Sequence, residues 1–133
     1  MILVDSSVWI DFFNQVQTPT SQQLVTLLQG GNATVAVADL VVYEVLRGFR
    51  HDKALEQAKE FLSALPRVDI GGFENALIAA DHYRALRAKG HTIRSPVDVL
   101  LASYCITHGH LLLHRDADFD QLETLRGLKT WPH

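Results

Sequence analysis

The sequence predicts one α/β domain over residues 1–133, in which helices flank a central, mostly parallel sheet to give three layers. Short apolar runs alternate along the chain with longer segments whose apolar residues recur at helical spacing. Apolar runs without an apolar–polar alternation are typical of parallel strands that are covered on both faces. No repeat or long linker divides the chain. A chain of this length buries roughly two-thirds of its unfolded surface, which is sufficient for a core without disulfides.

The predicted strands are short apolar runs that end at polar residues. The first run, Ile2–Val4, ends at Asp5, and a later one, Leu111–His114, leads into a polar stretch. The strands expected in all are residues 2–4, 34–37, 67–70 and 111–114, with 128–130 as a last edge strand.

The predicted helices are bounded by capping residues and glycines. Ser95 before Pro96 is a strong start signal, because a hydroxyl caps a helix and proline fits its first position. Gly109 ends that helix, and Asp39 and Asp52 are expected to cap two earlier ones. The helices expected are residues 8–13, 22–28, 40–47, 53–65, 73–89 and 96–107, and residues 115–120 are expected to form a polar loop.

Composition and charge limit the function. Twelve Lys+Arg against 15 Asp+Glu give a net charge of −3, which argues against a protein that coats nucleic acid non-specifically. The single Cys105 allows no disulfide within the chain and suits a reducing cytoplasm. No apolar stretch approaches the ~20 residues of a membrane span, and the N-terminus lacks the basic start of a signal peptide. We therefore expect a cytoplasmic protein that does not bind a membrane.

Four acids occupy positions where chemistry is expected. Asp5 follows the first predicted strand and Asp116 follows the strand at 111–114, so both can enter one crevice if these strands are neighbours. Glu44 and Asp98 lie within apolar helical runs, where an unpaired acid is costly. Four carboxylates at one strand edge would repel one another unless a hard divalent cation neutralised them. The pattern therefore favours Mg²⁺ or Mn²⁺ and phosphoryl chemistry.

Each acid also has a purely structural interpretation. Asp98 is placed to complement the dipole of its helix, and Glu44 to form an ion pair with Arg47. Asp5 could simply cap the next helix. The last acidic position stays open between Asp116, Asp118 and Asp120.

Four blocks of the chain carry a resemblance to a known family. The first, Ile2–Ile10, is a hydrophobic strand followed by Asp5 and two hydroxyl residues, and the second, residues 41–48, is a helix with an acid ahead of a glycine. Residues 92–102 and 112–119 are the third and fourth blocks. In this order they resemble the PIN-domain ribonucleases, in particular the toxin subunits of the VapBC toxin–antitoxin type.

The resemblance implies a PIN-like fold and a Mg²⁺- or Mn²⁺-dependent endoribonuclease. Metal-activated water would hydrolyse RNA phosphodiesters and leave a 5′-phosphate and a 3′-hydroxyl. It also implies that a cognate antitoxin holds the enzyme inactive and that the chain forms a homodimer.

By position, the resemblance assigns Asp5 and Asp98 as direct metal ligands. Glu44 would act through a water or a second metal, and Asp116 would complete the set, with Asp118 as its alternative. Hydroxyls that orient a water or a phosphate would come from Ser6 or Ser7.

RNA binding also needs positive charge near the acids. Arg94 and Arg115 each lie close to an acid in the sequence, and Arg47 follows Glu44 closely. We therefore expect these three arginines to contact RNA phosphates.

Two other enzymatic interpretations stay open. A metal-free acid–base ribonuclease would use the cluster His108, His110 and His114, although no ligand spacing supports zinc there. A metal-dependent phosphatase would need a second acid two residues after Asp5, where Ser7 stands.

A non-catalytic α/β module is the third alternative. Its acids would only cap helices, and an apolar surface around Trp9, Phe12 and Phe13 would bind a partner. A related hypothesis places an antitoxin groove near the helices at 8–13 and 39–48. Exposure of these aromatic residues would support it, and complete burial of all three would argue against it.

Overall fold

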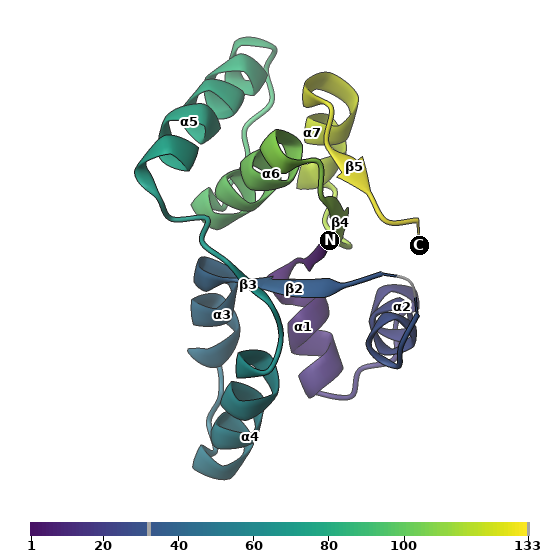
Figure 1. Cartoon of the computed structure of the whole chain (residues 1–133). Coiled ribbons are helices and arrows are strands. Elements are labelled where there is room, and N and C mark those ends of the chain that lie inside the picture. The colour runs from purple at the N-terminus through teal and green to yellow at the C-terminus, as the bar shows by residue number, and fades with distance from the viewer. Residues whose placement is uncertain (32, 133) are drawn as a thin grey trace.

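Five strands form one parallel sheet with helices on both faces (Figure 1). The computed structural model describes residues 1–31 and 33–132. The order across the sheet is β3-β2-β1-β4-β5, and every pairing in it is parallel. The predicted fold class is confirmed. The strands are β1 (Ile2–Val4), β2 (Val35–Ala38), β3 (Arg67–Val68), β4 (Leu111–Leu113) and β5 (Lys129–Thr130).

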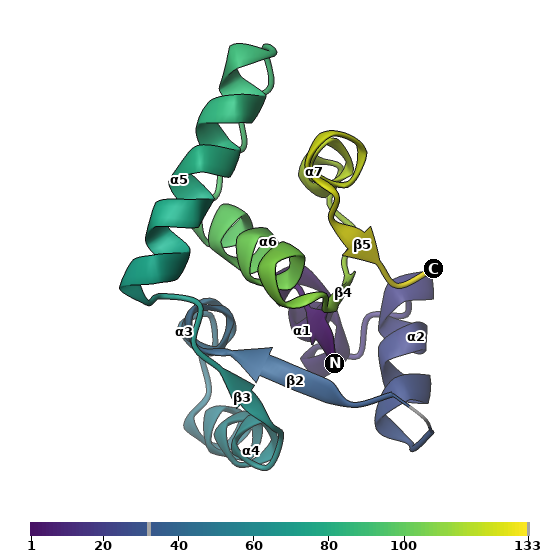
Figure 2. The ribbon, with the colours of Figure 1, turned by 45° about the horizontal axis from the view of Figure 1, so that its top comes forward.

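The helices form the two outer layers. Helices α1 to α4 lie on one face of the sheet and α5 to α7 on the other (Figures 1 and 2). Helix α1 packs against α2 and α3, whereas α5 packs against α6 and α7. Their bounds are α1 (Ser6–Phe13), α2 (Pro19–Leu28), α3 (Asp39–Leu46), α4 (Asp52–Ser63), α5 (Phe73–Ala88), α6 (Pro96–His108) and α7 (Asp118–Arg126).

The core lies between the sheet and both helical layers. Leu3 and Leu112 of the central strands are completely buried, as are Trp9 of α1 and Leu101 of α6. Cys105 is a buried free thiol in the same core. Burial of apolar residues from both helical layers on one sheet explains why the strands are apolar throughout.

Helix α6 begins and ends as the sequence predicts. The Ser95 hydroxyl accepts the N–H of Asp98, and Pro96 occupies the first helical position. Gly109 adopts a left-handed conformation with φ 70° at the other end. The cap by Ser95 places Asp98 in the first turn of the helix.

Asp39 does not cap α3 as expected. It is the first residue of the helix, and its Oδ1 accepts the N–H of Ile70 at 2.7 Å. The N–H of Ile70 therefore donates to a side chain and not to a carbonyl of a neighbouring strand. Strand β3 pairs with β2 only through Arg67 and Val68, which is shorter than the predicted strand at 67–70.

Other boundaries differ by a few residues. Asp52 is the first residue of α4 and His51 is its N-cap, so the expected cap is displaced by one position. Helix α2 begins at Pro19 rather than residue 22, because Thr18 and Ser21 cap each other's backbone N–H groups.

Helix α7 corrects the expectation of a polar loop at 115–120. The loop ends at Ala117, and Asp118 begins a helix that buries Phe119 and Leu122. The acids of its first turn obscure the helical spacing of these apolar residues, although Gly127 marks its end with φ 81°. No helix among the described residues has the length and apolar character needed to cross a membrane.

Candidate active site

The carboxyl ends of β1 and β4 bring Asp5 and Asp116 to the same edge of the sheet. Val4 pairs with Leu113, and the N–H of Asp5 donates to the carbonyl of Leu113 at 3.0 Å. Asp116 follows Leu113 by three residues in the loop that leads to α7. The two strands are therefore neighbours, which was the condition for a shared crevice.

Asp5 is buried and oriented by a neighbouring hydroxyl. The hydroxyl of Ser7 donates to its Oδ2 at 2.5 Å. Burial raises the pKa of Asp5 despite this hydrogen bond, and the charge of Asp116 raises it further. Asp5 is the N-cap residue of α1 but its side chain makes no capping bond, so capping does not account for its carboxylate.

Asp98 shows most clearly that the acids converge. Its side chain is buried on α6, and burial is the largest cause that raises its pKa to about 7. The next causes are the negative charges of Asp5, Asp116, Glu44 and Asp118. Five acids from four separate segments therefore act on one another across a single site.

Asp116 and Asp118 both lie beside Asp98. Each of the three offers a carboxylate oxygen, and these oxygens lie within 4.8 Å of one another. The N–H of Asp118 donates to Asp116 Oδ1 at 2.9 Å, which keeps the two side chains on the same side of the loop. The structure therefore brings both Asp116 and Asp118 beside Asp98, and both stay candidates for the last acidic position.

Glu44 reaches the site from α3. Its Oε1 is buried and has no hydrogen-bond partner among the described residues. The ion pair expected with Arg47 is also absent from this part of the chain, and the Arg47 guanidinium lies over the ring of Tyr43 at 5.4 Å. An unpaired buried carboxylate oxygen is costly, and a cation would satisfy it.

Comparison with known families gives the same result as the four sequence blocks. The model of a family described as PIN domain matches residues 2–125. The chain belongs to the PIN domain family. Ribonuclease VapC11 of Mycobacterium tuberculosis and VapC ribonuclease Mb1587 of Mycobacterium bovis are each 32% identical to it over 129 residues. Each alignment covers 97% of this chain and 96% of the relative.

Solved PIN domains share the fold over nearly the full length. VapBC2 from Rickettsia felis, bound to a promoter DNA fragment, matches with a TM-score of 0.75 at 20% identity over 99% of this chain and 100% of that one. FitAcB from Neisseria gonorrhoeae matches with a TM-score of 0.75 at 17% identity over 99% and 97%. These likenesses show that the fold is shared.

The three candidate arginines of this PIN domain have different surroundings. Arg47 and Arg94 are exposed and form no ion pair within the described residues. Arg94 lines a pocket of about 460 Å³ between α5 and α6, at the entrance to the turn that carries Asp98. Arg115 instead donates to Asp11 of α1, at 2.7 Å from Nε to Oδ2. The sequence did not single out Asp11, because the partner of a buried acid depends on tertiary packing.

The structure separates His114 from His108 and His110, so these three histidines do not share one site. His108 and His110 stack with Tyr104 at the C-terminal end of α6. Asp98 is at the other end of that helix, about 15 Å away at 1.5 Å per residue. His114 is buried against Phe119, and its Nδ1 accepts the N–H of Asp116 at 3.3 Å. A ring that orders the acidic loop in this way has a structural role.

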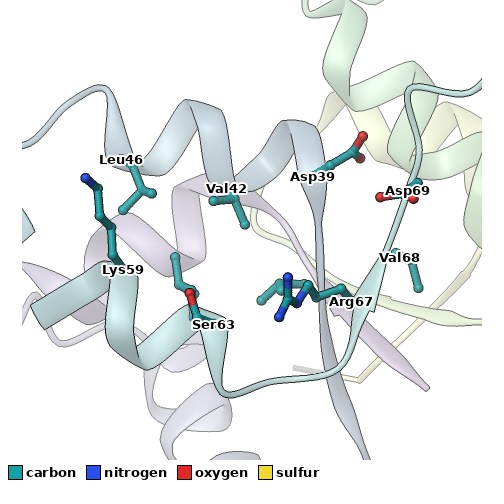
Figure 3. A pocket seen from close by; sticks show the side chains of 10 residues that line it. Asp39, Val42, Leu46, Lys59, Ser63, Arg67, Val68 and Asp69 are labelled. Carbon is teal, nitrogen blue, oxygen red and sulfur yellow. The ribbon is translucent and has the colours of Figure 1, made fainter. Parts of the chain in front are cut away.

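A separate pocket lies on the other side of α3 (Figure 3). It has a volume of about 480 Å³ between α3, α4 and β3, with Lys59, Ser63 and Arg67 at its rim. Val42 and Leu46 face it from α3, and Glu44, two residues from each, is on the opposite side of that helix. This cavity is therefore separate from the candidate site formed by the acids.

Proposed function

We propose that this PIN domain is a divalent-metal-dependent endoribonuclease that acts as the toxin of a toxin–antitoxin pair. The observation that carries the proposal is the meeting of Asp5, Glu44 and Asp98 with the acids of the β4–α7 loop. The names of its relatives, ribonucleases of the VapC type, support the same reaction.

The residues present fit a hard divalent ion. Every candidate ligand is a carboxylate oxygen, which suits Mg²⁺ or Mn²⁺ better than softer metals. The unpartnered Oε1 of Glu44 and the mutual repulsion felt by Asp98 are what a bound cation would relieve. When bound, such an ion supplies Lewis acidity, since it lowers the pKa of a water and neutralises charge on a phosphate.

The side chains divide the remaining work among them. Asp5 and Asp98 hold the ion directly, and the Ser7 hydroxyl keeps the Asp5 carboxylate in its orientation. Ser6 is half-buried beside it and is our second hydroxyl candidate for a water or phosphate contact. Glu44 acts through a water or a second ion.

The acids of the β4–α7 loop and the exposed arginines complete the site. Asp116 and Asp118 close it on the side of α7. Arg47 and Arg94 are the arginines that we place on RNA phosphates, because both are exposed and free of ion pairs within the described residues.

We also propose that an antitoxin binds along α1 and α3. Trp9 is completely buried, whereas Phe12 and Phe13 are half-buried. Phe13 lines a pocket of about 350 Å³ together with Phe49 and Val45. Solved structures similar to this chain include a toxin–antitoxin complex, which supports such a partner.

Exposed apolar side chains on α5 support self-association. Phe73 and Leu77 project from α5 with 79% and 56% of their surface exposed, and we propose that a second copy of this chain covers them in a homodimer.

The cytoplasm is our proposed compartment, because RNA and a reduced Cys105 are both compatible with it.

The proposed activity is tested directly with purified protein and total cellular RNA. New 5′ ends are mapped after incubation with Mg²⁺ or Mn²⁺ and again with chelator. We expect discrete cleavage only with metal, and Asp98→Asn should abolish it because the site loses a direct ligand. Asp69→Asn is the matched control, since Asp69 is exposed after β3 on the far side of α3. Cleavage that survives the chelator, or an active Asp98→Asn protein, would contradict the proposal.

A further inference from the structure

A buried acid of α1 is joined to the loop that carries two of the site acids. Asp11 is 7% exposed, and both of its carboxylate oxygens are used by Arg115. The distances are 2.7 Å from Nε to Oδ2 and 3.4 Å from Nη2 to Oδ1. This bidentate contact sets the orientation of the guanidinium as well as its position.

The two ends of this contact lie next to site acids along the chain. Helix α1, which carries Asp11, begins directly after Asp5. Arg115 immediately precedes Asp116, whose Oδ1 accepts the N–H of Asp118. The ion pair therefore connects the helix that follows Asp5 to the loop that carries Asp116 and leads to Asp118.

We propose that the Asp11–Arg115 pair is a positioning device that holds the β4–α7 loop so that Asp116 and Asp118 face Asp5 and Asp98. This inference rests on the proposed metal site, and it gives Arg115 a role different from that of a phosphate contact. Acids that repel one another move apart unless other contacts hold them, and a charge-assisted pair at the base of the loop opposes that movement. Partners behind metal ligands act in this way, since they orient the ligands without touching the ion.

The test is the Mn²⁺ affinity of the purified protein, measured by calorimetry without RNA. We expect Arg115→Gln to weaken Mn²⁺ binding about 10-fold, a typical effect of removing a group that orients a ligand. Arg115→Lys keeps the charge but loses the bidentate hydrogen bonding to Asp11. Its Mn²⁺ affinity should therefore lie between those of Arg115→Gln and the wild-type protein. Asp11→Asn should weaken Mn²⁺ binding as Arg115→Gln does. The double variant should bind Mn²⁺ no more weakly than the single variant with the lower affinity, because both changes break the same contact.

Kinetics separate positioning from phosphate binding. Misplaced ligands should lower kcat while the KM for RNA stays unchanged. If Arg115 instead contacts an RNA phosphate, Arg115→Gln should raise the KM for RNA. In that case Asp11→Asn should leave the Mn²⁺ affinity unchanged. The matched control is Lys59→Gln, which removes an exposed ion pair with Glu56 on α4 at 3.3 Å and should change none of these values.

Two results would overturn the proposal. One is a wild-type Mn²⁺ affinity in Arg115→Gln, and the other is a raised KM with unchanged metal binding. If Asp11→Asn fails to fold, the Arg115 variants still decide, because 47% of that side chain is exposed in a loop. A wild-type protein that binds no Mn²⁺ would overturn the proposed function itself, which is a distinguishable result.

Discussion

Asp98 lies in an apolar run of α6, and its surroundings explain why an acid is found there. Burial and the charges of four other acids raise its pKa to about 7, so the metal-free site holds a proton at mildly acidic pH. A cation would replace that proton, because metal ligands must be deprotonated. The same repulsion that makes the charged form of Asp98 unfavourable without a metal would therefore favour its binding to a cation.

The raised pKa predicts how stability depends on pH without metal. Between the ordinary pKa of 3.8 and about 7, the native state keeps a proton on Asp98 that the unfolded chain releases. The contribution of Asp98 to stability therefore falls as pH rises through this window. Urea unfolding in chelator should show a lower midpoint at pH 7.5 than at pH 5, and Asp98→Asn should flatten this trend. A midpoint that is equally pH-dependent in Asp98→Asn would show that another group is responsible.

At the scale of elements, the start of α6 connects stability to the site. The Ser95 hydroxyl accepts the N–H of Asp98, so the cap and the candidate ligand share one turn. Helix α2 has a comparable cap, where Thr18 Oγ1 accepts the N–H of Ser21 at 3.0 Å, but Thr18 lines a pocket together with Arg115 and Asp116. The control for a Ser95 variant is therefore Lys59→Gln on α4, away from the site acids.

Ser95→Ala should lower the free energy of unfolding by about 1 kcal/mol, the usual cost of losing a capping side chain. It should also weaken Mn²⁺ binding, because it loosens the turn that holds Asp98, whereas Lys59→Gln should leave the metal affinity unchanged. Urea unfolding and calorimetry measure the two effects. A wild-type metal affinity in Ser95→Ala would contradict the link between this cap and the site.

Element prediction succeeded where local signals were strong. Ser95, Pro96 and Gly109 define α6 within one residue of the structure. It failed at α7, where the acids at 116–120 look like a loop although Phe119 is completely buried. The reason is that a short amphipathic helix owes its stability to packing against the rest of the fold, which local pattern does not report.

At the scale of the whole molecule, the three layers converge on the proposed metal site. Asp5 and Asp116 follow sheet strands, Glu44 comes from the layer of α1 to α4, and Asp98 from the layer of α5 to α7. An ion bound by all of them connects segments that are distant in sequence. Binding to the native state alone stabilises the whole domain by mass action.

We therefore expect Mn²⁺ to raise the melting temperature. At about 100 times the Kd, the stabilisation is about 2.7 kcal/mol. For a domain of this size that corresponds to roughly 8–12 °C. Differential scanning fluorimetry with and without Mn²⁺ measures the shift, and Asp98→Asn should lose most of it. A melting temperature that millimolar Mn²⁺ leaves unchanged would remove the support for the metal site.

The sequence by itself determined the α/β class and identified Asp5, Glu44 and Asp98 as the acids to examine. Strand and helix periodicity, caps and an acid within an apolar run are local properties, so the chain displays them without its fold. Only the tertiary structure decided that Asp118 joins Asp116, and that Arg115 contacts Asp11, 104 residues away, rather than solvent. Those contacts depend on how α1 and the β4–α7 loop pack at one edge of the sheet. A local sequence pattern does not encode contacts between residues that are far apart along the chain.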